Sequence, residues 1–283
     1  MVLSPLFQER LILKIPKDIS GQIKRHLENE IEAGRRFAPL APVVVSEFLA
    51  SSVDEKAPRE APATTPPEAI TFESPVSPAQ AGDTPDKPLE DTLEGIAEGV
   101  ASCTACQLAQ TRTNTVPGAG NGASPDVMFI GEGPGRDEDE QGIPFVGRAG
   151  QLLTKMIEAM GYTRDEVFIA NVVKCRPPNN RVPEDDEMAA CLPSLLRQIK
   201  IVKPKAIVTL GATALKGLTG RTDVAISKER GVWNKFNGIP LMPTFHPSYL
   251  MRYPPAKVEA WKDLKAVLKL LGKTSPQTKG KGE

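Results

Sequence analysis

From Leu89 onward, short apolar runs alternate with longer stretches of helical period. Four runs have the length and composition of buried strands: DVMFIGE, VFIANVVK, KAIVTLG and IPLMPTFH. The helical stretches around them are LEDTLEGIAEGVASCTACQLAQ, AGQLLTKMIEAMG, PEDDEMAACLPSLLRQIKIV, ATALKGLTG and PAKVEAWKDLKAVLKLLG. Strands that alternate with helices build a parallel sheet covered on both faces. The pattern therefore predicts a three-layer α/β/α fold, whose ligands bind at the carboxyl ends of the strands.

The residues before Leu89 have a different composition. Ten prolines lie between Phe37 and Leu89, with many Ala, Ser, Thr and Glu and few large apolar side chains. Such a segment cannot bury enough surface to offset the entropy lost on ordering. We expect a short helical segment over residues 1–37, a disordered Pro/Ala-rich linker over 38–88, a globular domain over 89–273 and a flexible tail over 274–283.

Within the first segment, Ile19, Ile23, Leu27 and Ile31 recur at intervals of four, which fits one amphipathic helix. This helix docks on a protein partner or on the globular domain, or it is a weakly packed terminal helix. The weakly packed helix explains the pattern at least as well as docking does.

The 283-residue chain has no net formal charge, but its charges are unevenly placed. Acidic side chains outnumber basic ones before residue 100, and the reverse holds after it. A basic module on an acidic arm fits a polyanionic partner, although an ordinary solvated surface explains the same charges. No apolar run reaches the roughly 18 residues of a membrane span, and the N-terminus lacks the pattern of a signal peptide. We therefore expect a cytoplasmic monomer without a membrane partner.

All four cysteines fall in the globular part: Cys103, Cys106, Cys175 and Cys191. Disulfides are rare in a reducing cytosol, and the tight C-x2-C pair argues against four unrelated structural thiols. Zinc and an iron–sulfur cluster both use four cysteines. Zinc ribbons usually repeat a second close pair, whereas the second pair here is wide. The spacing favours a cluster and leaves zinc open.

The segment FIGEGPGRDEDEQGIPFVGRAG, over residues 129–150, runs from a strand through glycines to a helix. Gly131, Gly133 and Gly135 give G-x-G-x-G rather than the dinucleotide fingerprint G-x-G-x-x-G, and the Lys-Ser/Thr of a phosphate loop is absent. The acidic run over 137–140 would repel a polyphosphate. The segment is therefore a poor nucleotide cradle, and we expect its glycines to let a flat ligand approach the backbone.

Three motifs follow one another in a characteristic order: GEGPGRDEDEQGIPFVGRAG, VFIANVVKCRPPNNR and FHPSYL. With the C-x2-C pair ahead of them and Cys191 behind the second, they resemble the family 4 uracil-DNA glycosylases, the iron–sulfur type. The resemblance covers about residues 89–272. It implies a central four-stranded parallel sheet between helices and a 4Fe–4S cluster on the four cysteines. It also implies hydrolysis of the N-glycosidic bond of uracil in single- or double-stranded DNA, the first step of base excision repair.

The resemblance further implies roles for pocket residues. Phe145 looks like the aromatic side chain that stacks on uracil, and Glu138 resembles the residue that blocks the 5-methyl group of thymine. Glu132 is the carboxylate closest to the sugar, where it either positions water or opposes the cationic sugar. The backbone amides around Gly131 and Gly133 complete the pocket. The catalytic candidates are thus Glu132 and His246. The uracil-binding candidates are Gly131, Gly133, Glu138, Phe145 and Asn171. The expected cluster ligands are Cys103, Cys106, Cys175 and Cys191.

Elementary chemistry supports two of these assignments. An Asn amide at Asn171 offers one acceptor and one donor, which match N3–H and O4 of uracil and mispair with cytosine. His246 would donate to uracil O2 and stabilise the anion that leaves. The ordinary alternatives are a strand-end Asn bonded to backbone and a satisfied core His, and Pro247 and Ser248 weaken the second by placing His246 on a turn.

Residues around the pocket are candidate DNA contacts. The segment over residues 248–252 would press into the minor groove, and Lys228, Arg230, Arg176 and Arg181 would contact phosphates. Two other hypotheses stay open at this point. One is a non-catalytic DNA-binding or scaffolding module on the same fold, and the other is a zinc-stabilised nucleotide-binding protein.

Overall fold

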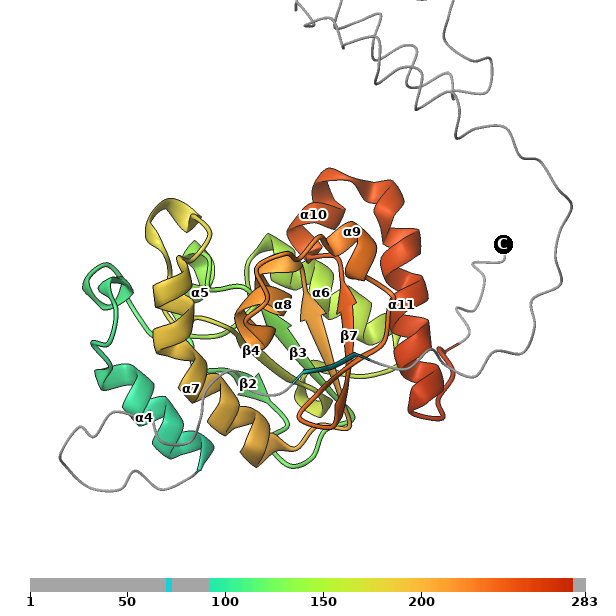
Figure 1. The fold of residues 1–283 in the computed structure, drawn as a ribbon, viewed down its shortest axis with the longest axis horizontal. Helices are drawn as coiled ribbons and strands as arrows, with labels where there is room; N and C mark the ends of the chain where they lie inside the picture. The colour runs from blue at the N-terminus through green and yellow to red at the C-terminus, as the bar shows by residue number, and fades with distance from the viewer. Residues whose placement is uncertain (1–69, 73–91, 277–283) are drawn as a thin grey trace, which may run out of the picture. The chain divides into compact units, whose positions relative to one another are not determined.

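The computed structural model describes residues 70–72 and 92–276 (Figure 1). All of them belong to one compact unit over residues 64–283. The predicted N-terminal helix, most of the predicted linker and the end of the predicted tail lie outside the described residues. Within the described part, no helix combines the length and the apolar character needed to cross a membrane.

The core of the fold is a seven-stranded sheet in the order β1-β6-β7-β5-β3-β4-β2. Its strands are β1 (Ile70–Phe72), β2 (Ala119–Gly120), β3 (Val127–Gly131), β4 (Phe168–Asn171), β5 (Ala206–Leu210), β6 (Asn234–Phe236) and β7 (Ile239–Thr244). The four central strands β7, β5, β3 and β4 are parallel, which confirms the predicted parallel sheet. The short strands β6 and β2 are antiparallel to β7 and β4, and β1 pairs in parallel with β6, so that β1 and β2 form the two edges.

Helices cover both faces of this sheet (Figure 1). The α-helices are α4 (Leu93–Ser102), α5 (Arg136–Gln141), α6 (Arg148–Ala159), α7 (Asp185–Val202), α8 (Ala212–Thr219), α9 (Ile226–Glu229), α10 (Pro247–Arg252) and α11 (Lys257–Leu270). Short 3-10 turns are η2 (Gln107–Gln110), η3 (Arg164–Glu166), η4 (Pro178–Asn180) and η5 (Pro254–Ala256). The three predicted layers are therefore present.

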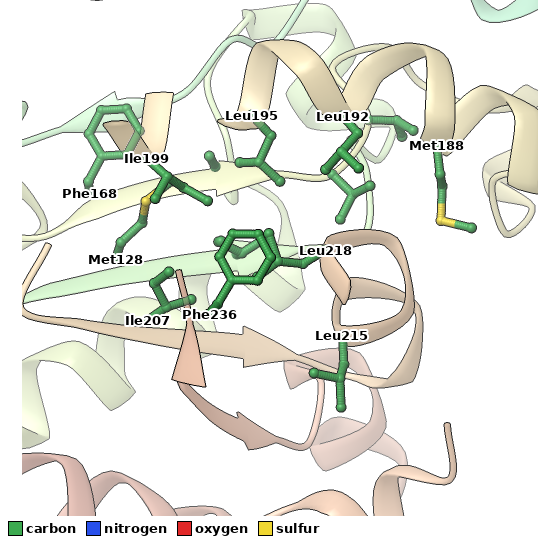
Figure 2. Close-up of a cluster of buried hydrophobic side chains, with 14 of the residues drawn as sticks. Met128, Phe168, Met188, Leu192, Leu195, Ile199, Ile207, Leu215, Leu218 and Phe236 are labelled. Atoms are coloured by element: carbon green, nitrogen blue, oxygen red, sulfur yellow. The ribbon is translucent and has the colours of Figure 1, made fainter. Parts of the chain in front are cut away.

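Two apolar cores result from the alternation of side chains along the strands. Met128 and Ile130 of β3 pack with α7 and α8, as Figure 2 shows for the cluster around Met128, Leu195 and Leu218. Val127 and Phe129 point to the opposite face, where α6 and α11 cover them. Because all strand residues of β3 are buried, the strand reads as a continuous apolar run rather than an alternating one.

Three elements differ from the sequence expectations. The helix expected over residues 89–110 ends at Ser102, because Cys103 takes an extended conformation and the chain bends through the C-x2-C pair. The acidic run over 137–140 belongs to the short helix α5, which begins after Gly135 and is capped by Glu138. Residues 70–72 lie inside the predicted linker, yet they pair with β6, so the linker prediction is wrong at these three residues. The free edge of β6 supplies the backbone partners that the local composition could not reveal.

Candidate functional site

The carboxyl ends of β3, β4 and β7 border a pocket of about 250 Å³. Among its lining residues are Glu132, Gly133, Glu138, Phe145, Asn171 and His246. These residues come from three separate segments of the chain: residues 132–145 after β3, the end of β4, and the start of α10 after β7. The parallel sheet brings them together because its strands end at a common edge.

Asn171 is the last residue of β4 and is paired with Gly131 of β3. Its side chain is 1% exposed, and its Oδ1 atom has no hydrogen-bond partner among the described residues. A buried acceptor without a partner costs about 1–3 kcal/mol, so native proteins rarely leave one unexplained. An unpartnered oxygen at the wall of a pocket indicates a ligand that donates a hydrogen bond there.

The backbone behind Asn171 is held by Lys174, a residue outside the predicted set of site residues. Lys174 is fully buried, and its Nζ donates to the Asn171 carbonyl oxygen at 2.8 Å and to Gln198 Oε1 at 2.6 Å. Burial lowers the pKa of Lys174 to about 8. A lysine inside an otherwise apolar run, VVKC, was the signal available in the sequence.

The ring of Phe145 lies directly over Gly131. A methyl group at residue 131 would collide with both the Phe145 ring and Asn171 Oδ1. A methyl group at residue 133 would approach Val173 Cγ2 to 2.7 Å. These two glycines thus make room for the protein's own side chains, and the close approach of a ligand to their backbone stays a prediction.

Phe145 has a φ of 53°, a left-handed conformation that is costly for a bulky residue. Arg164 holds this conformation by donating to the Pro144 carbonyl oxygen at 2.7 Å and to the Phe145 carbonyl oxygen at 3.0 Å. It also donates to Thr154 Oγ1 on α6. Arg164 therefore fixes the loop that carries Phe145, and nothing in the local sequence pattern indicated this contact.

Glu138 lines the pocket, but its two oxygens bind backbone amides. Oε1 accepts from the amides of Val146 and Gly147 at 2.9 and 2.8 Å, and Oε2 accepts from the amide of Gly135 at 3.1 Å. The side chain thereby joins the start of α5 to the start of α6. Its predicted contact with a 5-methyl group stays a prediction.

His246 is the residue before α10, and it caps that helix. Its Nδ1 accepts from the Ser248 amide at 3.1 Å and lies 2.7 Å from Ser248 Oγ. Burial, with the charge of Arg252 as a second cause, lowers the pKa of His246 to about 4. At neutral pH the imidazole is therefore uncharged. Because Nδ1 accepts a hydrogen bond from the Ser248 amide, the single ring proton resides on Nε2.

Glu132 follows β3 and is half-buried. Burial raises the pKa of its carboxyl group, and a hydrogen bond with the Thr213 side chain partly opposes that shift. The Glu132 carboxylate is thus a costly group for the folded state when it is ionised.

We expect Glu132→Gln to raise the midpoint of thermal unfolding at neutral pH. The pKa is higher in the folded state than in the unfolded state, so the wild type loses stability as the pH rises from about 4.5 through the folded pKa. The variant lacks this loss, and the two melting curves should converge below pH ~4.5. Glu98→Gln, which removes an exposed carboxylate of α4, is the matched control. Parallel pH profiles for Glu132→Gln and the wild type would contradict the assignment.

The four cysteines are free thiols drawn from three regions: the end of α4 and start of η2, the chain after β4, and α7. Electrostatic interactions link Cys175 with Cys103 and Cys106, and Cys191 with Cys106 and Cys175. Burial raises the pKa of Cys191 to about 11 and also raises that of Cys175. No three His, Cys, Asp or Glu side chains of the described ranges converge closely enough to hold one metal ion.

Two predicted DNA contacts have other partners in the structure. Arg230 is bound to Asp263 and Glu259 and is largely buried, so it is not free to bind a phosphate. Arg181, which lines the pocket, pairs with Glu187 at 2.6 Å. In the segment over 248–252, Leu250 is 1% exposed and faces the core, and it cannot act as a wedge without leaving it.

Comparisons with known proteins agree with this geometry. The model of the uracil DNA glycosylase superfamily matches residues 117–265. A type-4 uracil-DNA glycosylase of Thermotoga maritima is 51% identical over 58% of this chain and 85% of the relative. A second type-4 uracil-DNA glycosylase, of Sulfurisphaera tokodaii, is 50% identical over 64% of this chain and 85% of the relative. A third, of Archaeoglobus fulgidus, is 39% identical over 66% of this chain and 96% of the relative. The chain belongs to the type-4 uracil-DNA glycosylases of the uracil DNA glycosylase superfamily.

Proposed function

We propose that this protein flips uracil out of DNA and hydrolyses its N-glycosidic bond, leaving an abasic site for base excision repair. A base inside a duplex cannot reach the pocket, so the nucleotide must leave the stack before reaction. The observation that carries the proposal is the unpartnered Oδ1 of Asn171 at the pocket wall.

Recognition of uracil follows from the amide of Asn171. Its Oδ1 accepts the N3–H of uracil, and its amide nitrogen donates to O4, whereas cytosine reverses both groups. Phe145 supplies an apolar face beside this edge, and the Lys174 contact fixes the backbone that carries the amide. A site built to bond a polar edge rejects the mismatched base by about 10⁴-fold in favourable cases.

Cleavage leaves a uracil anion and a sugar with oxocarbenium character. Neutral His246 donates from Nε2 to uracil O2, where negative charge develops, and burial strengthens this interaction. Glu132 is the carboxylate that positions the attacking water or opposes the positive sugar. Both groups are preorganised: His246 by Ser248, and Glu132 by Thr213.

The first experiment is an excision assay on single- and double-stranded oligonucleotides that contain one uracil. Alkaline cleavage reveals the abasic product. Product from both substrates supports the proposal. Binding without product, from protein that retains its iron, would instead favour a non-catalytic module on the same fold.

Arg164→Ala should weaken uracil binding by about tenfold, which corresponds to 1.4 kcal/mol. The change removes the donors that bind the carbonyl groups of Pro144 and Phe145. The left-handed backbone conformation of Phe145 is then no longer stabilised, and its ring loses its fixed position. Inhibition of excision by free uracil measures the effect directly, and Arg164→Lys should recover part of it. Lys155→Ala, an exposed change on α6, is the control. An unchanged inhibition constant in Arg164→Ala would show that Phe145 needs no such support.

We also propose that Cys103, Cys106, Cys175 and Cys191 hold a 4Fe–4S cluster. The thiols interact electrostatically with one another, and the wide spacing of the second cysteine pair is unlike that of a zinc ribbon. The Lys174 amide donates to Cys191 Sγ at 3.3 Å, and Arg112 donates to Cys175 Sγ at 3.1 Å, contacts typical of cluster surroundings. When bound, the cluster supplies a cross-link among α4, the end of β4 and α7.

Purified protein is expected to contain iron, to absorb broadly in the visible range and to lack stoichiometric zinc. Cys191→Ser should reduce the iron content and lower the thermal unfolding midpoint, because the α7 attachment is lost. Metal analysis and absorbance provide the measurement, independently of activity. Ser102→Ala, beside the C-x2-C pair, is the control. Bound zinc in place of iron would overturn the cluster assignment.

A further inference from the structure

Three aromatic rings are stacked in a column that starts next to His246 and ends at the surface. The centroids of Phe245 and Tyr249 are 4.9 Å apart, with an interplanar angle of 32°. Tyr249 and Tyr253 repeat this arrangement at 4.9 Å and 34°. The three residues are spaced four apart, and the short helix α10 lies between Phe245 and its own C-cap, Tyr253, so the rings gather on one side of it.

The inner end of the column is fixed by charge. The guanidinium carbon of Arg230 lies 5.5 Å from the Phe245 ring centroid. Arg230 is itself held by two contacts to Asp263, one of them at 3.0 Å, and by Glu259. Thr244 Oγ1 donates to Asp263 at 2.7 Å, so the network is attached to the end of β7. The inner ring of the column therefore rests on a side chain that is itself held by several charged hydrogen bonds.

The outer end of the column is open to solvent. Tyr253 is 57% exposed, although one of its neighbours is the stacked ring of Tyr249. Leu250, in contrast, is 1% exposed and packs inward. A single exposed tyrosine needs no explanation, but an exposed ring at the end of a braced stack presents a preorganised apolar face.

We propose that Tyr253 is a stacking platform for an unpaired base of the uracil-bearing DNA strand. This inference rests on the proposed function. Aromatic side chains bind single-stranded bases by stacking with little regard to sequence. Arg252 and Lys257 are exposed on either side of Tyr253 in the chain, and both can contact the phosphates of such a strand.

The position of Tyr253 fits a base close to the flipped nucleotide. Helix α10 spans the six residues after His246, and six helical residues extend about 9 Å. That length corresponds to about two or three nucleotides of B-form rise. A strand whose uracil enters the pocket beside His246 can therefore place a neighbouring base over Tyr253.

The test is a binding series with single-stranded oligonucleotides that carry one 2′-fluoro-2′-deoxyuridine. The fluorine disfavours the cationic sugar, so the base stays attached during the measurement. Each nucleotide near the uridine is replaced in turn by an abasic tetrahydrofuran residue. Fluorescence anisotropy of the full-length wild type, Tyr253→Ala, Tyr253→Phe and Tyr253→Trp gives the dissociation constants.

We expect the wild type to bind about 5- to 100-fold more weakly when one particular neighbouring base is missing. Tyr253→Ala should show the same weakening on the intact strand and no further loss at that position. Tyr253→Phe and Tyr253→Trp should bind like the wild type, because each keeps a ring. Val258→Ala, an equally exposed change on α11, should have no effect.

A dissociation constant for Tyr253→Ala within twofold of the wild type would overturn the platform, as would an unchanged abasic profile. Excision by the wild type is measured in parallel on the corresponding deoxyuridine strand. Absence of excision defeats the proposed function alone, because stacking requires no cleavage and the binding series still decides the role of Tyr253.

Discussion

His246→Ala is expected to lower the single-turnover rate of uracil release by about 10²- to 10³-fold. The variant lacks the Nε2 donor at the oxygen where negative charge develops. Because that interaction strengthens in the transition state, the loss should appear in the rate at saturating DNA rather than in DNA affinity. Quenched single-turnover assays on a single-stranded oligonucleotide provide the measurement. His26→Ala changes the other histidine, which lies outside the described residues, and serves as the control.

The neutral state of the His246 imidazole can also be tested by its pH titration. Its folded pKa of about 4 lies below the ordinary value of 6.5, so the ring stays neutral through the physiological range. Because the pKa of His246 is lower in the folded state than in the unfolded state, its contribution to the free energy of unfolding is complete above pH 6.5. That contribution is lost as the pH falls towards 4. Proton NMR should show one histidine titrating near 4, and His246→Ala should remove that signal. A midpoint near 6.5 for His246, or a full excision rate in His246→Ala, would refute the neutral-donor account.

Asn171→Asp is expected to lower kcat/KM on uracil by at least about 10²-fold, within the range seen when a site mispairs a polar edge. The carboxylate keeps an acceptor for N3–H but loses the donor to O4 and places a second acceptor there. Burial at 1% exposure makes an ionised side chain still more costly at this position. Parallel assays on uracil- and cytosine-containing strands measure both the loss and any change in discrimination.

Asn234 offers a matched control for this change. It is also a buried asparagine whose Oδ1 has no partner among the described residues, but it lies on β6 and does not line the pocket. Asn234→Asp should lower the melting temperature without altering the preference for uracil. Equal losses of kcat/KM in the two variants would mean that Asn171 matters for stability rather than for recognition.

Much of the fold follows from local pattern. The runs DVMFIGE and KAIVTLG predicted β3 and β5 because buried parallel strands are apolar throughout. The short strands at this end of the sheet were not predictable in the same way. Ile70–Phe72 and Asn234–Phe236 are only three residues long, and they pair with each other across more than 160 residues of chain.

The candidate pocket could be found from motifs, but its supporting contacts could not. Arg164 reaches across 19 residues to Phe145, and Gln198 reaches across 24 to Lys174. Neither contact leaves a periodic or spacing signal in the sequence. For the same reason the sequence did not indicate that the Glu138 oxygens accept hydrogen bonds from the amides of neighbouring loops.

By itself, the sequence determined the α/β class, the order of the central strands along the chain, the four cysteines and the residues that gather at the pocket. These depend on apolar period, on glycine and cysteine spacing and on motifs that are local in the chain. Only the tertiary structure decided that Asn171 Oδ1 is unpartnered, that His246 is neutral and that Gly131 makes room for Phe145. Burial and hydrogen-bond satisfaction depend on which distant segments pack around a side chain, and that information exists only once the chain is folded.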